Sequence, residues 1–152
     1  MNNDMGKREF EEFLKLMAQD SKILFDKESW HNSVYFAGYT LEAYIKIILI
    51  HHEPEENFIG HLGDSDFLNK FRRLISLHPS FFNTSILKEN SYKYPRRLFN
   101  GGGNNNTKAA WKIKSRYKVE HWQDKSFAEE IQQEVVSIQE ALAQLRIDGV
   151  LS

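Results

Sequence analysis

An arginine and a histidine in the last third of the chain have the side chains that phosphate chemistry needs. Four residues separate Arg116 from His121, and a strongly helical segment follows them. Imidazole titrates near neutral pH, so His121 could move the proton of an attacking hydroxyl group. The guanidinium group of Arg116 suits phosphoryl oxygens better than an ammonium group does, and the N-terminus of a following helix would add favourable potential. The pair could therefore transfer a proton beside a bound phosphate group, and we expect no cofactor.

Positive charge is concentrated around this pair. Residues 70–118 contain twelve Lys or Arg and one acid, although the whole chain has a net charge of −1. Acidic helices could neutralise this block in the fold, or the block could form a surface that attracts phosphate. The second alternative predicts these RNA-binding residues: Arg96, Arg97, Lys112, Lys114 and Lys118. Tyr92 and Tyr94 could stack on bases beside Arg96 and Arg97, for which a solvated loop is the alternative.

Two other polar groups lie in or after an apolar segment. Glu42 and Lys46 are one helical turn apart, so they form either an exposed ion pair or a buried network that orients Arg116 or His121. The histidines and glutamates of residues 51–61 match no standard spacing of metal ligands. We interpret them as a solvated helix end, and we predict no metal site.

The elements that must position these residues are helices, because apolar side chains recur at three- and four-residue steps. The pattern predicts helices over 7–26, from an N-cap at Ser29 to just before Pro54, over 65–77, and after a capping box at 126–129. The predicted inward residues are Phe10, Phe13, Leu14, Met17, Ile23 and Leu24; Val34, Ala37, Gly38, Leu41, Ile45, Ile48 and Leu49; Phe67, Leu68, Phe71, Leu74 and Ile75; and Ile131, Val135, Ile138, Leu142 and Leu145.

The whole pattern predicts an all-α fold. No segment alternates like a strand, so we expect an antiparallel bundle of four to five helices that forms one domain over residues 1–152. Three glycines and three asparagines at 101–106 predict a flexible loop around 89–107. The absence of cysteine excludes disulfides and thiolate metal sites. A polar N-terminus and short apolar runs predict a cytoplasmic protein without a membrane segment.

These motifs resemble the HEPN family. The resemblance rests on the Arg116–His121 spacing before the last helix, on Trp111 upstream of Arg116-Tyr117, and on an aromatic, alanine-rich helix at 35–46 with Glu42 four residues before Lys46. It covers residues 14–49 and 111–145. HEPN domains are four-to-five-helix bundles, and many carry an Arg and a His at the start of the final long helix.

The resemblance implies a metal-independent endoribonuclease that acts as a homodimer, with two Arg–His pairs in one cleft. Arg116 and His121 would be catalytic, and Glu42, Lys46 and Tyr117 would support them. A role in a toxin–antitoxin or phage-defence system is also implied, with an antitoxin or another protein as partner. Members with Arg-Tyr after an upstream Trp include non-catalytic proteins. The alternative is therefore a module that binds a nucleotide or a partner protein.

Overall fold

The described part of the protein is helical. The computed structural model describes residues 3–52, 73, 117, 122–147, 149 and 151. Its long elements are α1 (Asn3–Asp26), α2 (Trp30–His52) and α6 (Lys125–Ile147), and no strand occurs within the described residues. The predicted all-α class is confirmed for this part. The helix predicted over 65–77 and the loop predicted around 89–107 lie outside it, apart from Arg73, which is helical and exposed.

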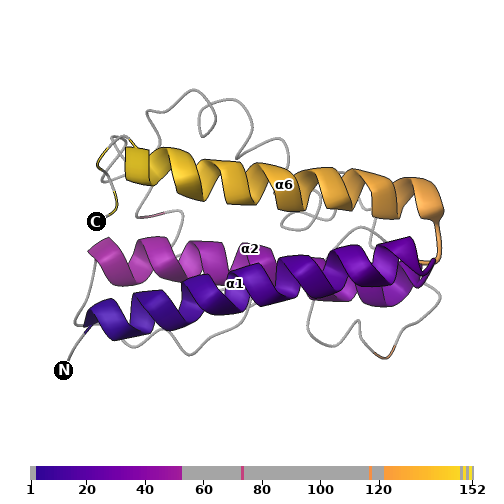
Figure 1. The fold of residues 1–152 in the computed structure, drawn as a ribbon, viewed down its shortest axis with the longest axis horizontal. Coiled ribbons are helices and arrows are strands. Elements are labelled where there is room, and N and C mark those ends of the chain that lie inside the picture. Colours follow the sequence, from indigo (N-terminus) through magenta and orange to yellow (C-terminus); the bar gives the residue numbers. More distant parts are fainter. Residues whose placement is uncertain are drawn as a thin grey trace.

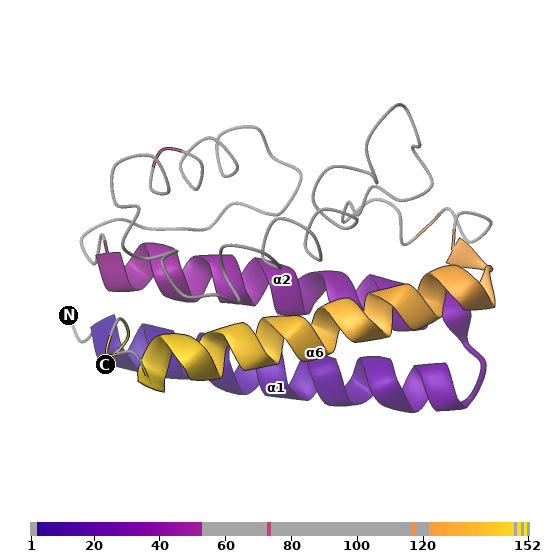
Figure 2. The same cartoon turned by 90° about the horizontal axis from the view of Figure 1, so that it is seen from above.

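The three helices lie side by side along the long axis of the molecule (Figures 1 and 2). Lys7 of α1 contacts His51 near the end of α2, whereas Ser21 of α1 contacts Ser33 near the start of α2. Gln132, near the start of α6, reaches the same Ser21. Hence α1 runs antiparallel to both α2 and α6, and these two run in the same direction.

α2 is buried on all sides over residues 40–49. Sixteen of its 23 residues are buried, and its predicted inward face is confirmed from Val34 to Leu49. By length and composition alone α2 could cross a membrane, yet 83% of its most apolar window is buried inside the protein. Core helices of soluble proteins pass the same test, so this feature is weak evidence for a membrane span.

α1 has one buried face and one exposed face. Leu14 and Met17 are buried as predicted, but the inward assignment of Phe13 and Ile23 is wrong, since they are 37% and 54% exposed. At about 100° per residue, Ile23 lies on the side of α1 opposite Leu14. The apolar residues of α1 therefore extend beyond its buried face.

The turn between α1 and α2 satisfies the backbone groups of both helix ends. The amide of Ser29 donates to the carbonyl of Leu24, and that of Glu28 donates to Phe25, the two bonds of a Schellman motif. Glu28 adopts a φ of 62°, which side-chain-bearing residues rarely do. Ser29 directly precedes α2 and its carbonyl accepts from Ser33, as expected for the predicted N-cap.

The start of α6 differs from the predicted capping box at 126–129. α6 begins at Lys125, and the amide of Ser126 donates to Asp124 Oδ1 at 2.8 Å. The carbonyl of Asp124 accepts from the amide of Ala128. Asp124 is therefore the N-cap, because its carboxylate accepts a first-turn amide that has no partner within the helix. Ser126 lies inside that first turn. The predicted inward face of α6, from Ile131 to Leu145, is confirmed.

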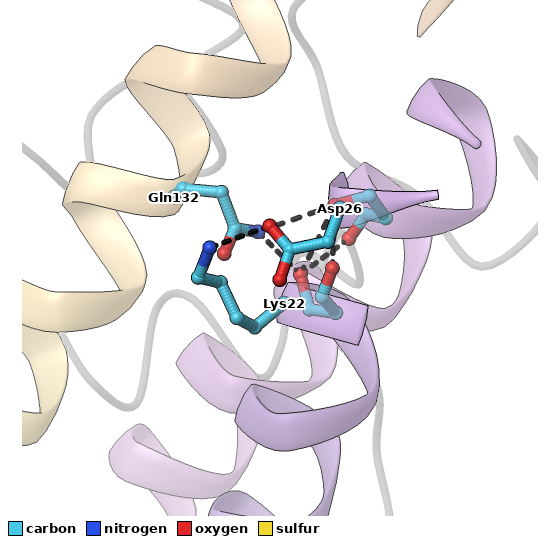
Figure 3. Close-up of polar contacts among 5 residues, drawn as sticks. Lys22, Asp26 and Gln132 are labelled. Atoms are coloured by element: carbon cyan, nitrogen blue, oxygen red, sulfur yellow. Dashed lines mark hydrogen bonds and ion pairs between the residues drawn. The ribbon is translucent and has the colours of Figure 1, made fainter. Parts of the chain in front are cut away.

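A polar contact joins all three helices near the start of α2. The hydroxyls of Ser21 and Ser33 each donate to the other residue's carbonyl, at 2.7 and 2.8 Å. The Gln132 amide donates to Ser21 Oγ at 2.7 Å and to Ser33 Oγ at 3.2 Å. Figure 3 shows Gln132 reaching across from α6, next to the exposed pair of Lys22 and Asp26. These bonds fix the height of α6 along α1 and α2.

Candidate functional site

Three residues predicted for the site are described: Glu42, Lys46 and Tyr117. The others lie outside the described residues: Arg116, His121, Arg96, Arg97, Lys112, Lys114 and Lys118. The described residues around the Arg116–His121 segment are therefore the ones that bear on the site.

Glu42 and Lys46 form a buried ion pair on α2. Lys46 Nζ lies 3.2 Å from Glu42 Oε1, and the two side chains are only 8% and 6% exposed, lysine first. Lys46 Nζ also lies 5.4 Å from the centre of the Phe10 ring of α1, a cation–π contact. Of the two predicted arrangements, the structure has the buried one. Burial removes water from both charges, so each depends strongly on its protein partners.

Trp122, the residue directly after His121, is held in the core. It is 0% exposed, and its ring stacks on His31 with centroids 5.1 Å apart and planes at 29°. His31, in the first turn of α2, is itself buried. This stack places Trp122 at the end of the bundle where α2 and α6 begin.

Tyr117, directly after Arg116, has the opposite environment. Its side chain is 81% exposed. An exposed aromatic ring is a surface on which an unpaired base can stack. Of the two described residues nearest to Arg116 and His121 in sequence, Tyr117 is therefore exposed to solvent and Trp122 is anchored in the core.

The buried ion pair lies at a different level of the bundle from the Trp122 anchor. Glu42 follows His31 by eleven residues in the same helix, which is about 16 Å along the axis. The described contact of Lys46 with Phe10 faces α1. The role of Glu42 in orienting Arg116 or His121 stays a prediction.

The N-terminus of α6 already carries an anion. The carboxylate of Asp124 accepts the hydrogen bond from Ser126 that a bound phosphate could otherwise accept. The extra attraction that this helix end was expected to offer an anion is therefore reduced.

Several buried polar residues were not identified from the sequence as parts of a site. These are His31, the Ser21–Ser33 pair, Glu134 and Tyr44. Burial raises the pKa of Tyr44 above its ordinary value of 10.0, and its hydroxyl has no hydrogen-bond partner among the residues that the structure describes. Contacts between residues distant in sequence leave no local signal, although a polar residue at a core position of a helix could have pointed to Tyr44. No cluster of three metal-binding side chains occurs among the described residues.

No family model matches the chain, and no curated protein or solved structure does so either.

Proposed function

We propose that this protein binds RNA and cleaves it at Arg116 and His121, in the manner of HEPN endoribonucleases. The observation that carries the proposal is the buried Trp122–His31 stack. Consecutive Cα atoms are about 3.8 Å apart, so anchoring Trp122 limits where His121 can lie. A proton-transfer residue needs such restriction, because small displacements of a catalytic group slow the reaction strongly.

The proposed reaction uses a nucleophile of the substrate. His121 accepts the proton of the 2′-hydroxyl, the 2′-oxygen forms a bond to phosphorus, and the bond to the 5′-oxygen breaks. The leaving oxygen takes a proton from an imidazolium group or water, and the product carries a 2′,3′-cyclic phosphate. Arg116 stabilises the negative charge on the phosphoryl oxygens. Tyr117, 81% exposed, would stack on a neighbouring base.

The assembly belongs to the same proposal. We infer a HEPN-type bundle of four to five helices in the cytoplasm, with two copies pairing their Arg–His sites. Arg96, Arg97, Lys112, Lys114 and Lys118 would hold the RNA backbone. An antitoxin or other protein would restrain the activity.

The test is cleavage of a labelled single-stranded RNA by the purified protein. Arg116→Ala and His121→Ala should each abolish cleavage while leaving helicity unchanged. His52→Ala is the matched control, because His52 lies in the last turn of α2, at the far end from the Trp122 anchor, and it should cleave like the wild type. A chelator should have no effect, and the product should end in a cyclic phosphate. Unchanged cleavage in His121→Ala would contradict the proposed role.

A nucleotide-binding module is the second candidate, and the exposure of Tyr117 favours it too. In this case the wild type leaves diverse RNAs intact but binds a fluorescent nucleotide. Binding should weaken in Tyr117→Ala and Arg116→Ala but not in His121→Ala. The response of binding and cleavage to His121→Ala separates the two functions.

A further inference from the structure

No further inference is drawn: the strongest candidate, the exposed apolar side of α1 around Leu16 and Ile23, carries nothing, because nothing in the described part of the chain shows what covers it.

Discussion

At the scale of single residues, the core of this bundle contains polar groups that differ in whether they are satisfied. The hydroxyls of Tyr35 and Tyr39 lie 2.9 Å apart in a hydrogen bond, whereas the fully buried hydroxyl of Tyr44 has no such partner in the described part of the chain. A buried donor without a partner loses its bonds to water and gains none. The two tyrosines at 35 and 44 therefore make opposite contributions to stability through the same functional group.

We expect Tyr44→Phe to raise the free energy of unfolding by about 1 kcal/mol, because it removes an unsatisfied hydroxyl. Tyr35→Phe is the control and should lower it by a similar amount, since Tyr39 loses a partner. Urea unfolding followed by circular dichroism measures both. A loss of stability in Tyr44→Phe would mean that its hydroxyl makes a bond in solution.

The same residue should make the protein sensitive to alkali. Burial raises the pKa of Tyr44 in the folded state above its ordinary value of 10.0. Below about pH 10 the phenol is protonated in both states, so its ionisation does not change the free energy of unfolding. At higher pH only the unfolded phenol ionises, and the free energy of unfolding falls by up to about 1.4 kcal/mol per pH unit. The stability advantage of Tyr44→Phe over the wild type should therefore grow between about pH 9 and about pH 11. A constant difference across this range would show that the phenol ionises in the folded protein.

The buried pair of Glu42 and Lys46 gives a prediction about single and double changes. Glu42→Leu removes the carboxylate 3.2 Å from Lys46 Nζ and should destabilise the protein by about 3–5 kcal/mol. Glu42→Leu/Lys46→Met removes both charges and should recover most of this loss, because apolar residues of similar volume need no partner. Urea unfolding of the three proteins checks this. If the double variant is as unstable as Glu42→Leu, other contacts of these residues dominate.

At the scale of elements, the helix ends depend on a few residues. Glu28 closes α1 with a φ of 62°, a conformation that a side chain disfavours by about 1–2 kcal/mol. We expect Glu28→Gly to raise the free energy of unfolding by about 1 kcal/mol, whereas Glu28→Ala should give no comparable gain. Thermal unfolding measures the difference. Equal midpoints of thermal unfolding for Glu28→Gly and Glu28→Ala would mean that the φ of residue 28 costs the protein no stability.

The sequence predicted the helices and their buried faces better than it predicted the residues that cap the helices or the contacts between distant residues. The buried faces of α2 and α6 follow from three- and four-residue spacing, because a helix repeats every 3.6 residues. Ile23 fits an apolar pattern yet points outward, since the pattern does not show which apolar side meets the core. Asp124 rather than Ser126 caps α6. Both residue types can cap a helix, so the sequence alone does not show at which of the two the helical backbone begins. The Trp122–His31 stack joins residues far apart in sequence, so no local pattern could reveal it. Arg116 and His121 stay predictions.

At the scale of the whole molecule, the Trp122–His31 stack lies at the end of the bundle where α2 and α6 begin. The proposed pairing of two Arg–His sites would bring this same end of two copies together about a twofold axis. Mass measurements at rising concentration should therefore show a dimer. A monomer at every concentration would contradict the pairing.

The burial of α2, complete on all sides over residues 40–49, has a consequence for the order in which the protein opens. Amide hydrogens of a helix exchange with solvent only when its hydrogen bonds break, and α2 cannot separate from the core without exposing most of its sixteen buried residues. Hydrogen–deuterium exchange should therefore be slowest in peptides from 30–52 and should accelerate with urea as steeply as global unfolding does. The exposed turns of α1 should exchange through smaller local openings. Equal exchange in both helices, independent of urea, would mean that α2 detaches on its own.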